Sequence, residues 1–198
     1  MPQKIKLPEN LLIASPLPSG KSGYTWTFAS LLGHMLRLAQ QMFGARDHSY
    51  TILGIEFTAK DHPNLWHPRN GKDIIIQLTQ RCLEQPQRAC FQMSHEVVHL
   101  LSPTGRKQTN VLDEGLASYF SIYYMTHVIG NPNWRYNIAS YDAAMTLVKV
   151  LLEIDPDAVK TLRAEQPTIP LIGEELILKH YPQVTQPVAA ALAAQFER

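Results

Sequence analysis

The sequence predicts an α+β protein in which a small sheet near the N-terminus is followed by a mainly helical C-terminal part. Two short segments rich in β-branched residues predict strands, at 50–57 (YTILGIEF) and 73–79 (DIIIQLT). From residue 86 onward, apolar residues recur at helical spacing between prolines and glycines, which predicts helices almost to the end of the chain. Because 45% of the 198 residues are hydrophobic and 18% are charged, residues 1–198 are expected to form one domain with its own core.

Residues 1–110 are expected to form an irregular lead-in, a helix, two strands and a second helix, in that order. Residues 1–23 contain four prolines and little periodicity, so they predict an irregular lead-in. Residues 24–110 are expected to hold a helix over Tyr24–Phe43, then the two strands, then a helix that Pro86 begins. The polar connection between the strands, with its Asn70–Gly71 turn, is predicted to be a loop.

The remaining residues, 111–198, are expected to be helical. Apolar periodicity and the positions of Gly130, Pro167, Pro170 and Pro182 set the expected ends of these helices. The predicted helices cover residues 111–130, 138–154, 156–165, 173–181 and 184–197.

Charge and composition narrow the possible partners and the compartment. Lys and Arg total 18 and Asp and Glu total 17, a net charge of +1, so neither nucleic acid nor a membrane surface is an expected partner. The N-terminus does not read as a secretory signal, and no apolar stretch is long enough to span a bilayer. Cys82 and Cys90 are too few for a disulfide framework and are expected to be reduced thiols. A cytoplasmic location is therefore the expectation.

The segment MSHEVVHLL, residues 93–101, carries the chemistry that stands out. His95 and His99 are four residues apart, so on a helix they lie one turn apart on the same face and can both bind one metal ion. Glu96 is rotated by about 100° from His95, so it can flank such an ion and take a proton from a metal-activated water. This arrangement is the physical content of the HExxH motif.

A hydrolytic zinc ion needs a third protein ligand, and Glu114 is the candidate. It lies fifteen positions after His99 on its own predicted helix, beyond a polar turn that can fold this helix back against the first. Gly115 and Ala117 are small and would permit a close approach of the two helices. The neighbouring Asp113 would face about 100° away from Glu114, so only one of the two carboxylates can bind the ion.

With HExxH followed by the helix E-G-L-A-x-Y, residues 73–125 resemble the gluzincins, the peptidase MA-like zinc metallopeptidases. The resemblance implies a zincin-like fold, with His95, His99 and Glu114 as zinc ligands and Glu96 as the general base. It also implies that Asp73–Thr79 is the edge strand that pairs with an extended peptide. Asp113 is then expected to accept a hydrogen bond from a ligand histidine.

The expected activity is hydrolysis of peptide bonds in a peptide or protein substrate, with one Zn²⁺ per chain. The tetrahedral oxyanion needs a further donor, for which the downstream tyrosines and one histidine are candidates. Among them His180 and Tyr181 are favoured because they end a short predicted helix before Pro182. The full set of candidates is Tyr119, Tyr123, Tyr124, Tyr136, Tyr141, His180 and Tyr181.

Two other functions are compatible with the same residues. The zinc could stabilise the fold of a non-catalytic binding or regulatory domain, or it could be the catalytic metal of a hydrolase that acts on a non-peptide amide. The loop DHPNLWHPR, residues 61–69, could contact substrate at the mouth of a cleft, but a solvated connection between strands is the favoured interpretation.

Overall fold

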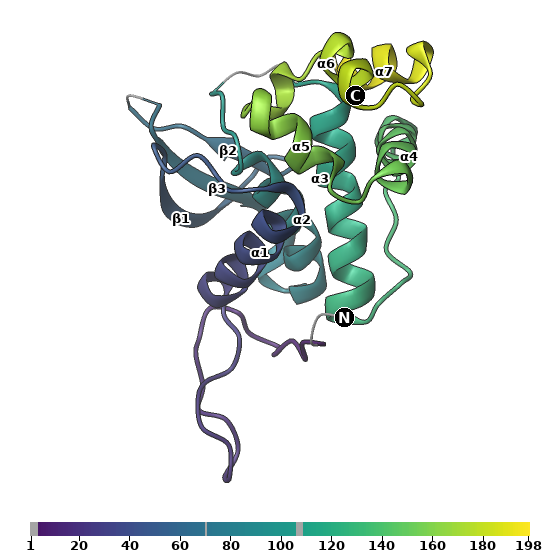
Figure 1. Cartoon of the computed structure of the whole chain (residues 1–198). Helices are drawn as coiled ribbons and strands as arrows, with labels where there is room; N and C mark the ends of the chain where they lie inside the picture. Colours follow the sequence, from purple (N-terminus) through teal and green to yellow (C-terminus); the bar gives the residue numbers. More distant parts are fainter. Residues whose placement is uncertain (1–3, 70, 106–108) are drawn as a thin grey trace.

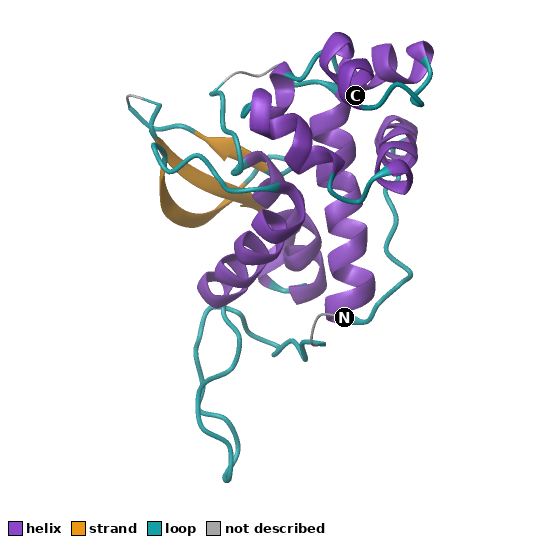
Figure 2. Ribbon diagram, viewed as in Figure 1, coloured by secondary structure: helices purple, strands orange, loops and turns teal. Residues whose placement is uncertain are grey.

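The computed structural model describes residues 4–69, 71–105 and 109–198, with a small sheet on one side of the molecule and helices packed against it (Figure 1, Figure 2). The first helix, α1 (Phe28–Phe43), begins where Thr27 caps it. Thr27 Oγ1 accepts a hydrogen bond from the Ser30 backbone N–H, and Ser30 Oγ accepts one from that of Thr27. The predicted start at Tyr24 is wrong because Tyr24 forms a β-bridge with Pro16 instead.

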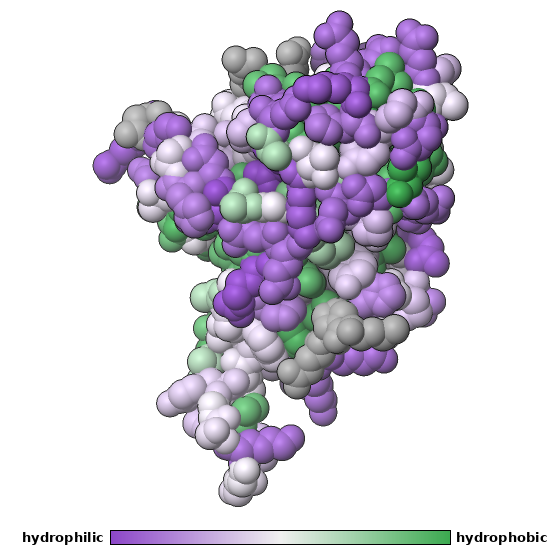
Figure 3. Space-filling model, in the orientation of Figure 1, coloured by the Kyte–Doolittle hydropathy of each residue, from purple (hydrophilic) through white to green (hydrophobic). Residues whose placement is uncertain are grey.

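Residues 12–24 form an arm that stands clear of the body, whereas Ile5 and Leu11 before it are buried in the core (Figure 1, Figure 3). Two backbone hydrogen bonds, Thr25 N to Ser15 O and Leu17 N to Gly23 O, hold its two sides together around the Pro16–Tyr24 bridge. Apart from this bridge, the described residues before α1 form no helix or strand, as their prolines predict.

The sheet contains three strands in the order β1–β3–β2, with bounds Thr51–Thr58 for β1, Asp73–Thr79 for β3 and Asn64–Trp66 for β2. β1 is parallel to β3, and β2 is antiparallel to it. The expectation that Asp73–Thr79 is an edge strand is therefore wrong: β3 is the central strand and β2 lies at the edge. The connection between β1 and β3 is predicted to be a loop, but part of it forms β2, so this prediction is wrong there. Asn70, which belongs to the predicted turn, lies outside the described residues.

Three long helices form the centre of the helical part. α2 (Pro86–His99) begins with a proline in its first turn, and α3 (Val111–Tyr123) packs between α2 and α4 (Ala139–Ile154) (Figure 1). α3 continues as one stretch of π-helix, η2 (Tyr124–Ile129), which ends at Gly130 in a left-handed conformation, φ 80°. Residues 111–130 thus form the continuous helical segment that the sequence predicts.

The close approach of α3 involves a different neighbour from the expected one. A Cβ on Gly115 would lie 2.5 Å from the backbone oxygen of Ala144 and 2.6 Å from Val148 Cγ2. Both residues belong to α4. The absence of a side chain at Gly115 therefore allows α3 to pack on α4, and the expectation that it serves the contact with α2 is wrong.

Short helices and an extended tail complete the chain. The short helices are α5 (Ala158–Glu165), α6 (Glu174–His180) and α7 (Gln186–Ala193), with single 3₁₀ turns η1 (Gln80–Leu83) and η3 (Ile169–Leu171). The predicted helix to residue 197 stops at Ala193. Beyond it the tail runs antiparallel to the segment before α3, with hydrogen bonds from Val111 N to Ala194 O and from Phe196 N to Thr109 O.

The buried apolar side chains form one cluster that includes residues from α1, the sheet and the later helices. Cys82 and Cys90 are both buried and unpaired with each other, which agrees with the expectation of free thiols. Among the described residues, no helix combines the length and apolar character needed to cross a membrane.

Candidate metal centre

Two helix ends meet at the site. His95 and His99 lie on the last turns of α2, a helix buried almost continuously from Ala89 to Val98. Glu114 lies in the first turns of α3, which Asn110 caps by accepting a hydrogen bond from the Asp113 backbone N–H at 2.9 Å. Asn110 Nδ2 also contacts the carbonyl oxygens of Ile169 and Ile172, both at 3.3 Å, so the start of α3 is tied to η3.

The ligand atoms of His95, His99 and Glu114 all lie within 4.8 Å of one another. His95 Nε2 is 3.2 Å from both His99 Nε2 and Glu114 Oε2, and His99 Nε2 is 3.8 Å from Glu114 Oε1. Zinc–ligand bonds of about 2.0–2.2 Å in tetrahedral geometry separate neighbouring ligand atoms by about 3.3–3.6 Å. The spacing of the three side chains, brought together from two helices, therefore fits a zinc ion.

An unsatisfied oxygen supports the same interpretation. Glu114 Oε2 is buried and accepts no well-oriented hydrogen bond from the described residues. A buried carboxylate oxygen without a donor is costly unless a cation lies beside it. Two imidazole nitrogens and one carboxylate oxygen form a donor set that can bind zinc and other first-row divalent ions.

Each histidine is held through its other ring nitrogen. His99 Nδ1 lies 2.9 Å from Asp113 Oδ2, and because an ionised carboxylate only accepts, the imidazole donates there and leaves Nε2 for the cluster. Thr109 Oγ1 donates to the same Asp113 oxygen at 2.7 Å. His95 Nδ1 lies 2.9 Å from the hydroxyl of Tyr136. The sequence predicts that Asp113 accepts a hydrogen bond from a ligand histidine, and Asp113 does so from His99.

The electrostatics of the cluster favour a positive charge at its centre. Burial lowers the pKa of His99, but the Asp113 and Glu114 carboxylates outweigh it and raise this pKa to about 10. Burial likewise raises the pKa of Glu114, but His99 and His95 outweigh it and lower this pKa to about 2. The three ligand side chains thus attract either protons or a metal ion into the space between them.

The cluster opens into a cleft of about 700 Å³. Glu96, which is 4% exposed, contributes to the wall of this cleft beside the three ligands, and its burial raises the pKa of its carboxyl group. The β2 residues form the wall nearest the sheet, and Tyr141 contributes from α4. His62, Trp66 and His67 also line the cleft, and part of the segment 61–69 forms β2, so contact of this segment with a substrate stays a prediction.

Two of the predicted site residues are not brought to the cluster. His180 Nε2 lies 3.0 Å from Glu165 Oε1, and the Tyr181 hydroxyl donates to Asp155 Oδ2 at 2.6 Å. Neither lines the cleft. Their helix, α6, packs against α5 and α7 rather than against α2, so the expectation that they donate to an oxyanion is wrong.

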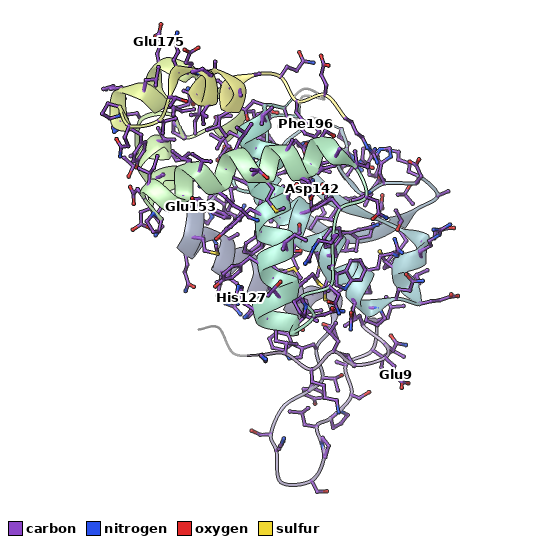
Figure 4. The ribbon with its side chains drawn as sticks, turned by 90° about the vertical axis from the view of Figure 1, so that its right-hand side faces the viewer. Glu9, His127, Asp142, Glu153, Glu175 and Phe196 are labelled. Atoms are coloured by element: carbon purple, nitrogen blue, oxygen red, sulfur yellow. The ribbon has the colours of Figure 1, made fainter. Side chains whose placement is uncertain are left out.

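Tyr141, another of the tyrosines that the sequence offers as an oxyanion donor, lines the cleft beside the cluster. Its ring centroid lies 5.8 Å from that of His95 and 5.0 Å from that of Phe196 in the tail. Figure 4 shows Phe196 beside the end of α4 that carries Asp142. Burial raises the pKa of Tyr141 to about 12, so its hydroxyl keeps its proton at neutral pH and is a donor.

Sequence reasoning missed the partners that hold the histidines and the strand at the mouth of the cleft. The sequence suggests Tyr136 only as an oxyanion donor, and neither Thr109 nor Ser121 belongs to a recognisable motif. Local pattern does not reveal them because Tyr136 lies forty-one positions from His95. The segment before Asp113 did contain a usable signal, since Thr and Asn often precede and cap a helix.

The cluster of three ligand side chains is the feature that an account of function has to explain. Within the described residues, His95, His99 and Glu114 form a group of side chains that could hold a metal ion. Its ligands are buried or nearly so, its histidines are oriented by hydrogen bonds, and it lies at the base of an open cleft. No family model, curated protein or solved structure matches the chain.

Proposed function

We propose that this protein is a zinc-dependent metallopeptidase that hydrolyses peptide bonds in a peptide or protein substrate. The observation that carries the proposal is the convergence of His95, His99 and Glu114 at zinc-ligand spacing with Glu96 on the wall of the same cleft. A purely structural zinc site is usually closed by four protein ligands, whereas a catalytic one keeps a position open. Three ligands facing a cleft correspond to the catalytic arrangement.

In the proposed mechanism, separate residues bind the metal, act as the general base and donate a hydrogen bond to the oxyanion. His95, His99 and Glu114 would hold the zinc ion, which would supply a Lewis acid for the scissile carbonyl and for a water molecule. Glu96 is the general base, which takes a proton from the attacking water and passes it to the leaving amine. Tyr141 donates its hydroxyl proton toward the oxyanion from the α4 side of the cleft.

The substrate is proposed to bind in extended form along β2. This strand lies at the edge of the described sheet, pairs with β3 on one side only and lines the cleft through Asn64, Leu65 and Trp66. An edge strand offers unpaired backbone groups that can hydrogen-bond an extended peptide. This geometry favours a peptide over a small non-peptide amide.

The arrangement of elements also supports a zincin-like fold of the gluzincin type. A small sheet precedes the HExxH helix α2, and the third ligand lies on the next helix, α3. In this proposal the substrate strand is β2, whereas the sequence resemblance implies β3.

The first experiment measures zinc per chain by elemental analysis in the wild type and in Glu114→Ala. About one zinc per wild-type chain is expected, with near-complete loss in the variant, because two histidines alone leave an incomplete site. Glu153→Ala, which removes an exposed carboxylate from α4 (Figure 4), is the matched control and should keep its zinc.

The outcome decides among the candidate functions. Negligible zinc in the wild type, even after incubation with the metal, would contradict the proposal. Zinc bound at one per chain without cleavage of any peptide would favour the non-catalytic domain. Cleavage of amides that contain no peptide bond, with peptides left intact, would favour the non-peptide hydrolase.

A further inference from the structure

The orientation of His95 depends on a hydrogen bond that leads away from the proposed zinc site. A neutral imidazole carries one N–H and one lone pair, so His95 can bind a metal through Nε2 only when its proton is on Nδ1. His99 achieves this through the Asp113 carboxylate. His95 has no carboxylate on Nδ1; its neighbour there is the hydroxyl of Tyr136, at 2.9 Å, which can either donate or accept.

A chain of hydrogen bonds determines whether the Tyr136 hydroxyl donates to His95 Nδ1 or accepts from it. The Ala117 carbonyl oxygen can only accept, so Ser121 Oγ donates to it, at 2.7 Å. The one hydroxyl proton of Ser121 is thereby used, so Ser121 accepts the proton of Tyr136, at 3.0 Å. Tyr136 then has no proton left for His95 and must accept from it. The backbone of α3 therefore dictates, through two hydroxyls, that His95 carries its proton on Nδ1.

The Tyr136 ring is fixed by its neighbours. It stacks on Tyr141 with ring centroids 5.0 Å apart and packs against Phe91 at 4.8 Å. The segment that carries it is attached to α2, because Asn131 Nδ2 and Trp134 Nε1 both donate to Gln87 Oε1, at 2.7 and 3.2 Å. The hydroxyl is consequently held in place before any metal binds.

We propose that Tyr136 is the positioning residue of the zinc site, which fixes the tautomer and orientation of His95 through Ser121 and the Ala117 carbonyl. The inference rests on the proposed zinc function. It also makes the two histidines unequal: His99 is backed by a charged carboxylate and His95 by a neutral chain of hydroxyls. Tyr136 thus orients its histidine without adding charge to the site.

The test compares Tyr136→Phe with a matched variant, Tyr124→Phe. Tyr136→Phe keeps the ring and removes the acceptor of His95, so the affinity for zinc should fall by about 10–100-fold, the range typical of lost ligand partners. Tyr124 also has a hydroxyl 2.9 Å from a histidine Nδ1, that of His34, which does not belong to the metal cluster. Tyr124→Phe should therefore leave zinc affinity unchanged, as measured by competition with a chromophoric chelator.

A second variant, Ser121→Ala, separates tautomer control from packing. It removes the acceptor of the Tyr136 proton, which then divides between the neighbouring Ser118 hydroxyl and His95 Nδ1, and donation to His95 favours the tautomer that cannot bind zinc through Nε2. Nitrogen-15 NMR of the histidine rings should show the Nδ1–H form of His95 in the wild type and a mixture in Ser121→Ala. Zinc affinity should fall by several-fold, although Ser121 does not contact His95.

The possible failures are distinguishable. Zinc affinity in Tyr136→Phe within twofold of the wild type, or an unchanged His95 tautomer in Ser121→Ala, would overturn the positioning role and leave the metallopeptidase proposal intact. Absence of zinc binding in the wild type would overturn both. Thermal unfolding of the metal-free variants confirms that each one is folded before its zinc affinity is compared.

Discussion

At the scale of single residues, Glu96 differs from the three ligand side chains in what it faces. The ligand atoms of His95, His99 and Glu114 point toward one another. The side chain of Glu96 is rotated about 100° around α2 from that of His95 and lines the wall of the cleft. It is buried without belonging to the metal cluster. Its carboxylate is therefore expected to be dispensable for metal binding and, in the proposed mechanism, to act on the substrate.

Glu96→Gln should separate these two properties. The amide has the same size but cannot take a proton from water, so the rate of peptide cleavage should fall by at least about 10²–10⁴-fold. Zinc content should stay near that of the wild type. Elemental analysis and a cleavage assay with a mixture of peptides measure both, and an undiminished rate would remove Glu96 from the mechanism.

At the scale of elements, the site depends on how α3 is clamped between two other helices. Glu114 reaches the histidines of α2 from one side of α3, while the next residue, Gly115, packs against the backbone of α4. A side chain at Gly115 would have to push the two helices apart because backbone atoms cannot rotate away. The position of α3, and with it that of Glu114, therefore depends on a residue without a side chain.

Two glycine-to-alanine substitutions should consequently act in opposite directions. Gly115→Ala places a methyl group 2.5 Å from the Ala144 backbone oxygen and should destabilise the protein by about 3 kcal/mol or more. Gly33→Ala, inside α1, meets only the Arg37 side chain at 3.7 Å and should stabilise by about 0.5–1 kcal/mol. Urea unfolding measures both, and equal effects would contradict the tight α3–α4 packing.

At the scale of the whole molecule, one buried arginine joins the early and late parts of the chain. The Arg163 guanidinium, on α5, donates to the carbonyl oxygens of Phe43, Gly44 and Ala45 at the end of α1 and to that of Leu101 just beyond α2. These groups have no partner within their own helices because they lie at or beyond helix C-termini. Arg163 thus fixes the end of the helix that carries His95 and His99.

Removing this guanidinium should weaken the entire domain. Arg163→Met removes the donor of the buried Phe43 carbonyl and of the partly buried Gly44 and Ala45 carbonyls, whereas Leu101 O keeps the Asp47 N–H, and the change should cost about 2–4 kcal/mol in the free energy of unfolding. Arg163→Lys should recover only a small part, because a single ammonium group cannot reach four separate carbonyl oxygens in a planar fork. Chemical denaturation tests this, and a loss below 1 kcal/mol for Arg163→Met would contradict it.

Much of the fold follows from local pattern, and that part was predictable. The β-branched segments that became β1 and β3, Pro86 at the start of α2 and Gly130 at the end of the helical segment from 111 each depend on residues only a few positions apart. β2 is not predictable in this way because its three residues, Asn64–Trp66, are too few to show alternation and lie between two prolines. The extended tail after Ala193 was missed because its pairing partner is some eighty residues away in sequence.

The sequence by itself determined the chemistry of the candidate site. Four positions separate His95 from His99, and helix geometry alone places them on one face with Glu96 at their side. The tertiary structure decided what surrounds them, which included Tyr136 behind His95, Tyr141 in the cleft, β2 at the sheet edge and His180 far from the site. The physical reason is range: a helix sets the relation between neighbours one turn apart, whereas contacts across tens of residues exist only once the helices and the sheet have packed.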